Sequence, residues 1–151
     1  PFFSPEARAG YFGISQHTTR AELQRAVFEG LAYAIVDSLQ GYPQGGELYL
    51  TGGGAASATW LQIIADCTGR TVVSSTFNEL SARGAAILAA RSVDALSRYP
   101  ALEQTRYRPN PQAHSRYVAL YPVYRLLREQ MLPVWHARRE ALQRISQEQR
   151  I

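Results

Sequence analysis

The chain has 151 residues, 46% of them hydrophobic, and a formal net charge of +4, which suits one globular domain with a core of its own. No apolar run reaches the roughly 20 residues of a membrane span, and no signal-peptide pattern opens the chain. All sixteen basic residues are arginine, so a P-loop, which needs a lysine, is excluded within these residues. The single cysteine, Cys67, excludes an internal disulfide and favours a reducing cytoplasm.

A long helix is predicted over residues 19–41. Thr19 and Glu22 form a capping box, and apolar residues repeat behind them at helical spacing. Gly41 is expected to end the helix. Asp37, near that end, is expected to be solvated. Close helix packing is expected to explain Gly30 inside this helix and Gly84 in a later one, and nucleotide contact is the alternative for Gly84.

Strands and helices then alternate. Residues 47–51 predict a strand buried on both faces, residues 57–68 a helix, residues 71–75 a second strand, and residues 80–92 a further helix. This order favours an α/β domain with parallel neighbouring strands. Residues 99–115 have a weak pattern.

A final helix is predicted from about Gln112, where tyrosines and leucines repeat every three or four residues. Pro122 and Pro133 are expected to kink or split it. Residues 106–151 contain nine arginines and three acids, a net charge of +6. A basic tail can bind nucleic acid, but a solvated helix face is the favoured interpretation, and no nucleic-acid or membrane partner is predicted.

Three glycines, Gly52, Gly53 and Gly54, separate the first predicted strand from the next helix. Glycines let a ligand lie directly on the main chain, and the helix start beside them, with Ser57 as the expected N-cap, favours negative charge. The pattern indicates a nucleotide or phosphate ligand, and the alternative is a tight turn with no ligand. A Rossmann fingerprint is disfavoured, because Ser57 stands where its third glycine belongs.

Other polar residues are given no chemical role. Asp66, inside a predicted helix, is expected to be a structural hydrogen-bonding or solvent-facing group, and Asp94 is likewise given no catalytic role. Cys67 is expected to be a small core residue. No metal site is predicted, because the histidines lack metal-ligand spacing: they are His17, His114 and His136.

Three stretches resemble the FGGY family of carbohydrate kinases. "LTGGGAASATWLQIIADCTGRTV" resembles the adenosine-site motif of that family. The residues that match it are Gly52 to Ala55, Trp60, Gln62, Ile63, Ala65, Asp66, Gly69 and Val72. "ARAGYFGISQHTTRAELQRAVFEGLAYAIVDSL" resembles the segment before this motif, and "NELSARGAAILAA" resembles a later helix of the family. Together they cover about residues 5–92, in the order the family has them.

The resemblance implies a ribonuclease-H-like domain of the actin/hexokinase type, the C-terminal half of a two-domain sugar kinase, with C-terminal helices. Residues 1–110 would form the nucleotide-binding domain, in part, and residues 111–151 its helical extension. The implied cofactor-binding residues are Gly52, Gly53, Gly54, Ala55, Ser57 and Ala58. Ala58 replaces the asparagine of some glycerol kinases, which makes that type a poorer match.

The resemblance further implies ATP and Mg²⁺ as cofactors and a sugar or polyol substrate, with a pentulose such as xylulose favoured. In this family the catalytic aspartate lies in the N-terminal half, so no catalytic residue is expected here. The chain opens at Pro1 and its only methionine is Met131, so a piece of a longer, cytoplasmic protein is expected, with a homodimer left open. The alternative is a non-catalytic nucleotide-binding or interaction module of the same fold.

Overall fold

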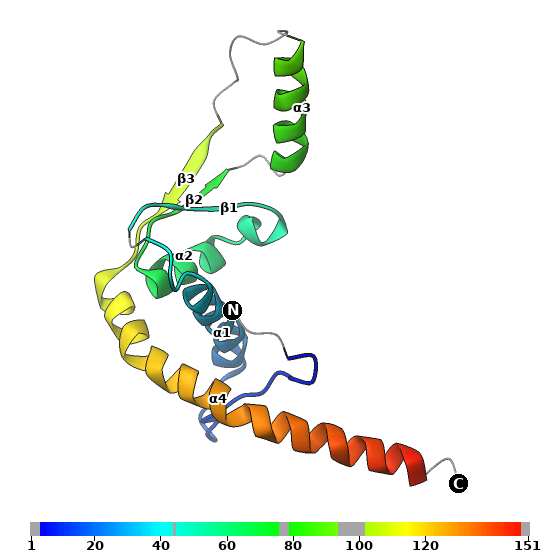
Figure 1. The fold of residues 1–151 in the computed structure, drawn as a ribbon. Coiled ribbons are helices and arrows are strands. Elements are labelled where there is room, and N and C mark those ends of the chain that lie inside the picture. The colour runs from blue at the N-terminus through cyan, green and yellow to red at the C-terminus, as the bar shows by residue number, and fades with distance from the viewer. Residues whose placement is uncertain (1–3, 44, 76–78, 94–101, 149–151) are drawn as a thin grey trace.

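The computed structural model describes residues 4–43, 45–75, 79–93 and 102–148. Figure 1 shows a small sheet with α1 and α2 beneath it, and α3 above the sheet, away from those two helices. The long α4 runs along one side. The elements in chain order are α1 (Arg20–Ser38), β1 (Leu48–Leu50), the 3-10 turn η1 (Gly53–Ala56), α2 (Ala58–Thr68), β2 (Val72–Ser75), α3 (Leu80–Ser92), β3 (Gln104–Tyr107) and α4 (Pro111–Glu148). The predicted helices and the first two strands are confirmed within one to three residues.

The sheet has the order β1-β2-β3. β1 pairs with β2 in parallel, with Leu48 opposite Val72, as the alternation of strands and helices predicts. β3 pairs with β2 antiparallel, with Val72 opposite Tyr107. The prediction that β1 is buried on both faces is wrong: Leu48 and Leu50 pack against the core from one face, and Tyr49, which alternates to the other face, is 64% exposed.

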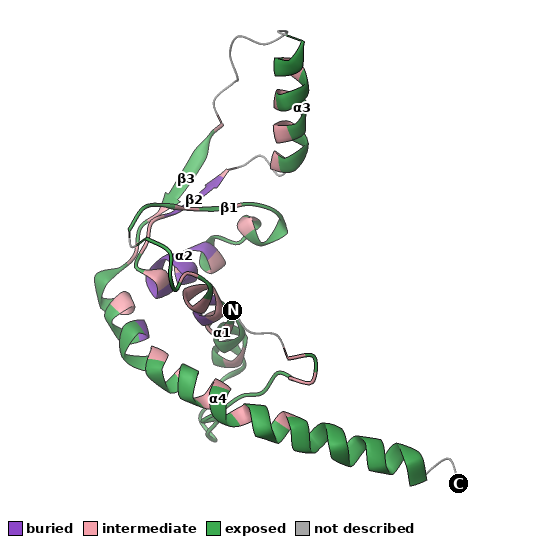
Figure 2. Ribbon diagram, viewed as in Figure 1, coloured by how far each residue is buried: buried purple, intermediate pink, exposed green. Residues whose placement is uncertain are grey.

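The core surrounds α2, which is buried along most of its length (Figure 2). Its buried apolar side chains pack with Ala32 and Tyr33 of α1, Val72 of β2 and Tyr117 of α4. Burial of a leucine or isoleucine contributes about 1.5–3 kcal/mol, so this central helix stabilises the domain strongly. The α2 residues concerned are Leu61, Ile63, Ile64, Ala65 and Cys67. The prediction for Cys67 is confirmed, since it is 5% exposed.

The ends of α1 and α2 follow local rules. The Thr19–Glu22 capping box is present, with the Glu22 N–H donating to Thr19 Oγ1 over 3.3 Å. α1 ends at Ser38 with Leu39 as its cap, so Gly41, at φ 89°, lies in the following turn and does not cap the helix as predicted. α2 ends at Gly69, which is left-handed at φ 68°, a conformation that favours glycine.

Asp37 is not solvated, contrary to prediction. Its side chain is 8% exposed and pairs with Arg128 of α4, and it accepts a hydrogen bond from the Tyr121 hydroxyl. The sequence placed Asp37 at a helix end but did not show that α4 returns along α1. These contacts join the two helices through charge as well as through packing.

α4 is one continuous helix through Pro122 and Pro133. Of the two expected outcomes, a kink or a split, the helix is not split, and it changes direction along its length (Figure 1). Gly30 and Gly84 do not serve close packing either, because a Cβ at either position would have no neighbour within 4 Å among the described residues.

Candidate functional site

The glycine loop joins the end of β1 to the start of α2. Gly52 leaves the strand at φ 84° and ψ −172°, and the Ala55 N–H then donates to the Gly52 carbonyl over 2.9 Å. The resulting turn, η1, presents exposed main chain at Gly53 and Gly54. The predicted strand–loop–helix is therefore present and faces solvent.

The three glycines have different surroundings. Gly52 has a backbone conformation that is almost restricted to glycine. A Cβ on Gly54 would lie 3.4 Å from Nε1 and 3.6 Å from Cδ1 of Trp60. Gly53 has neither constraint: its φ is not left-handed, and a Cβ there would meet nothing within 4 Å among the described residues. Within the loop, Gly53 is thus the position where added side-chain atoms would meet nothing in the described chain.

The start of α2 is capped as predicted. The Ser57 hydroxyl accepts a hydrogen bond from the Trp60 N–H over 3.3 Å, and the carbonyl of Ser57 accepts one from the Leu61 N–H over 3.0 Å. Ala58, in the first turn, is exposed. A helix N-terminus carries roughly half a positive charge, so this end of α2 favours an anionic group beside the loop.

A second element holds the loop from the sheet side. The hydroxyl of Ser74, a buried residue of β2, donates to the carbonyl of Ala55 over 3.4 Å. Since β1 and β2 are parallel, their carboxyl ends lie at the same edge of the sheet. The six predicted cofactor-binding residues are therefore gathered at that edge, with Ala55 half-buried and the other five exposed.

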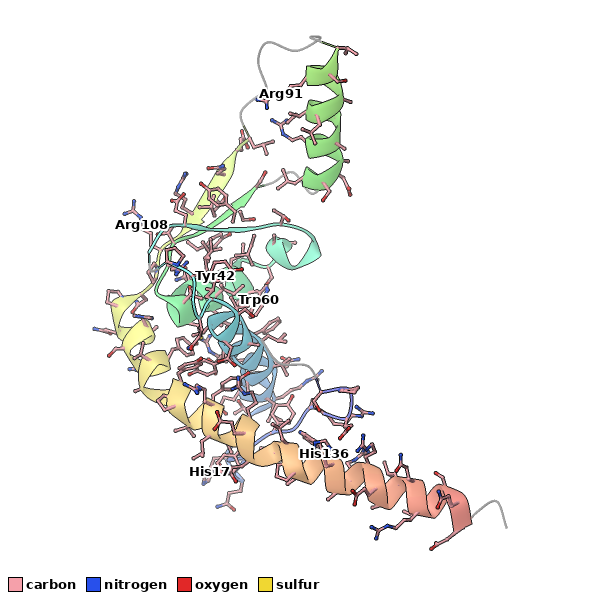
Figure 3. The ribbon with its side chains drawn as sticks, viewed as in Figure 1. His17, Tyr42, Trp60, Arg91, Arg108 and His136 are labelled. Carbon is pink, nitrogen blue, oxygen red and sulfur yellow. The ribbon has the colours of Figure 1, made fainter. Side chains whose placement is uncertain are left out.

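The sequence did not show what Trp60 and Ser74 do here. It indicated Trp60 as part of the family motif, but not its position beside Gly54. In the structure Trp60 is half-buried between the turn and α1 (Figure 3), and its ring packs on Phe28 with centroids 5.4 Å apart. The available sign was the position of Trp60 three residues after the N-cap, over the turn that precedes it.

Asp66 has the structural role that was predicted. It is 6% exposed, and its Oδ1 accepts hydrogen bonds from Gln62 Nε2 and from the Asn110 N–H, each over 2.8 Å. Asn110 in turn caps α4, accepting from the Ala113 N–H over 3.1 Å. The carboxylate therefore ties α2 to the start of α4. Asp94 lies outside the described residues.

No group of three or more His, Cys, Asp or Glu side chains in the described ranges could hold a metal ion. None of the helices described is both long and apolar enough to cross a membrane.

Comparison with known proteins places the chain in a family. Residues 1–93 match the model of the FGGY family of carbohydrate kinases, C-terminal domain. Xylulose kinase of Escherichia coli K12 is 32% identical over 146 residues, which are 89% of this chain and 30% of the relative. Glycerol kinase of Koribacter versatilis Ellin345 is 37% identical over 121 residues, covering 72% of this chain and 24% of the relative.

Solved structures agree with the sequence comparison. The crystal structure of xylulose kinase from Rhodospirillum rubrum superimposes with a TM-score of 0.74 at 28% identity, covering 87% of this chain and 28% of that one. The chain thus spans less than a third of the length of these relatives. It belongs to the FGGY family of carbohydrate kinases, and the predicted α/β domain of the actin/hexokinase type is confirmed.

Proposed function

We propose that this domain holds the nucleotide end of ATP in a carbohydrate kinase that transfers the γ-phosphate to a sugar or polyol hydroxyl. The observation that supports this most is the exposed main chain of Gly53 beside the start of α2, where a Cβ would meet nothing within 4 Å among the described residues. Family membership supplies the reaction class, since residues 1–93 match a domain of carbohydrate kinases.

The proposed binding residues are Gly52, Gly53, Gly54, Ala55, Ser57 and Ala58. Gly53 and Gly54 would let the nucleotide lie against the main chain. The N-terminus of α2, capped by Ser57, would attract its negative charge. The loop fits ATP in this respect: a methyl group at position 53 would fill the space that the ligand needs.

The catalytic carboxylate is assigned to another part of the kinase. Phosphoryl transfer needs a group that accepts the hydroxyl proton, and Mg²⁺ that neutralises charge on the phosphates. Asp66 is engaged by Gln62 and Asn110, and Asp37 by Arg128 and Tyr121. Neither carboxylate is available for that step.

In the proposed enzyme, residues 1–110 form the nucleotide-binding part, and residues 111–151 extend it with α4. The protein is proposed to be cytoplasmic, with a homodimer still to be tested.

The favoured substrate is a pentulose such as xylulose, since relatives named xylulose kinase match most of this chain. Because the glycerol kinase relative is 37% identical, a polyol is the alternative substrate. The test is a panel of sugars and polyols with ATP and Mg²⁺, using the full-length protein that contains this domain. ADP formation that depends on a pentulose supports the proposal, and formation with glycerol alone would move the substrate to a polyol.

A non-catalytic nucleotide-binding module is the second candidate, because Asp37 and Asp66 are both engaged in structural contacts. It would bind ATP in calorimetry while producing no ADP with any member of the panel. Failure of the full-length protein to bind ATP would contradict both candidates.

A further inference from the structure

We infer that Trp60 is a positioning residue: its indole holds the Gly53–Ala56 turn in the shape that receives the nucleotide, without touching the nucleotide itself. The inference rests on the proposed function, since it assumes that ATP lies on this turn. It assigns a role to a residue outside the six proposed binding residues, because Trp60 would affect binding by holding Gly54 in position.

The first observation is the contact with Gly54. Trp60 is the third residue of α2, and its indole edge lies beside Gly54, with Nε1 3.4 Å and Cδ1 3.6 Å from where a Cβ at that position would be, which is van der Waals distance. The turn is therefore supported on the side that faces α2. At Gly53 a Cβ would meet nothing within 4 Å among the described residues, so the indole does not reach the position where the ligand is proposed to lie.

The second observation is that the indole is itself held in place. Its ring packs on Phe28 of α1, with centroids 5.4 Å apart and planes tilted by 41°. The backbone N–H of Trp60 donates to Ser57 Oγ over 3.3 Å. Aromatic pairs of this kind restrict ring position and contribute beyond their buried area. Trp60 thus connects the turn to α1 as well as to its own helix.

These contacts matter because the turn contains consecutive glycines, which have the largest conformational freedom of any residue. A turn that must become ordered on binding weakens the ligand's affinity by the free energy of ordering. The indole at Gly54 and the Ser74 hydroxyl at Ala55 order it in advance. Loss of the indole should therefore weaken ATP binding even though no ligand contact is removed.

The test uses Trp60→Leu and Trp60→Phe in the full-length kinase. Trp60→Leu should raise the KM for ATP about tenfold, which corresponds to about 1.4 kcal/mol, while kcat and the KM for the sugar change less than about threefold. Trp60→Phe should lie between Leu and the wild type, since it keeps a ring against Phe28. Trp135→Phe, in α4, is the matched control and should leave the KM for ATP unchanged.

Double-mutant cycles separate positioning from general stability. Trp60→Leu combined with Gly54→Ala should be non-additive in the KM for ATP, because the two positions touch. Combined with Gly53→Ala it should be additive, because a methyl group at 53 meets nothing. If the Trp60→Leu protein does not fold, the same measurements are made on the milder variant, Trp60→Phe.

Two results would overturn the inference: an unchanged KM for ATP in a folded Trp60 variant whose melting temperature has fallen, or additive effects with Gly54→Ala. The proposed function fails differently. If Gly53→Ala leaves the KM for ATP unchanged, the nucleotide does not lie on the turn. If Gly53→Ala raises it and Trp60→Leu does not, only the role of Trp60 is lost.

Discussion

Replacing Gly53 by alanine separates ligand binding from folding more cleanly than any other change in the loop. The added methyl group would have no neighbour within 4 Å, and the φ of Gly53 is accessible to alanine. Where the conformation allows it, a Gly→Ala change stabilises a protein by about 0.4–1 kcal/mol through the unfolded chain. We therefore expect the free energy of unfolding of Gly53→Ala to be unchanged or slightly raised.

The same methyl group should interfere with a nucleotide that lies on the main chain. Forcing an extra methyl group into a packed contact costs about 1–3 kcal/mol, which corresponds to a loss of ATP affinity of about fivefold to 150-fold. Isothermal titration calorimetry on the full-length protein measures this loss. The affinity for the sugar should not change, because the change lies at the nucleotide end.

Two matched variants make the result interpretable. Gly52→Ala places alanine at φ 84° and ψ −172°, so it should lower stability by about 1–3 kcal/mol as well as affinity. Gly30→Ala, on α1 with no neighbour within 4 Å, should leave ATP affinity unchanged. If Gly53→Ala unfolds like the wild type and binds ATP equally well, the nucleotide does not contact this main chain and the assignment of the loop is refuted.

Three further predictions concern the scaffold. Asp37→Asn should lower the free energy of unfolding by about 1–3 kcal/mol, because the Asp37 carboxylate, 8% exposed, pairs with Arg128 and accepts from the Tyr121 hydroxyl, and the amide weakens both interactions; denaturant unfolding measures this. Gly69→Ala should also be strongly destabilising, by thermal unfolding, because the residue is left-handed at φ 68° and its Cβ would lie 2.6 Å from the His114 ring. Burial, and then a hydrogen bond to Glu29, raise the pKa of Tyr117 to about 12 from 10.0. The folded state thus keeps a proton that the unfolded state releases, so stability is complete below pH 10 and falls from pH 10 to 12, by up to about 1.4 kcal/mol per pH unit for this group.

Each of these has a control within the chain. Glu140→Gln removes an exposed pair with Arg144 and should lower the free energy of unfolding by less than about 0.5 kcal/mol. If Asp37→Asn lowers it by no more than Glu140→Gln does, the Asp37–Arg128 pair does not stabilise the fold as expected. Gly30→Ala should stabilise α1 by up to about 1 kcal/mol, opposite in sign to Gly69→Ala. Tyr117→Phe should make the fall between pH 10 and 12 shallower, and an unchanged slope would exclude Tyr117 as a source.

Local rules predicted most of the fold. The Thr19 capping box, the Ser57 cap and the spacing of apolar residues depend on neighbours within a few positions, and the sequence shows those neighbours directly. β3 was missed because its side chains at Gln104, Thr105 and Arg106 are exposed and lack the apolar alternation that indicates a strand. Its existence depends on pairing with β2, which is a long-range contact.

The candidate site divides in the same way. The glycines, the cap and the family were visible in consecutive residues. The different surroundings of Gly52, Gly53 and Gly54 were not visible in the sequence, because they depend on a backbone angle, on empty space and on the position of the Trp60 indole. The environment of Asp37 was predicted wrongly for a related reason: its partner, Arg128, lies 91 residues away along the chain.

The link between Asp66 and Asn110 has a practical consequence for shortened versions of this protein. The family match ends at residue 93, which invites truncation there. Such a version would lose the Asn110 N–H that satisfies the Asp66 carboxylate, and with it Tyr117, which covers α2. A buried carboxylate and an apolar helix would then face water, so that protein should be recovered as aggregate, while one that retains α4 should be recovered folded.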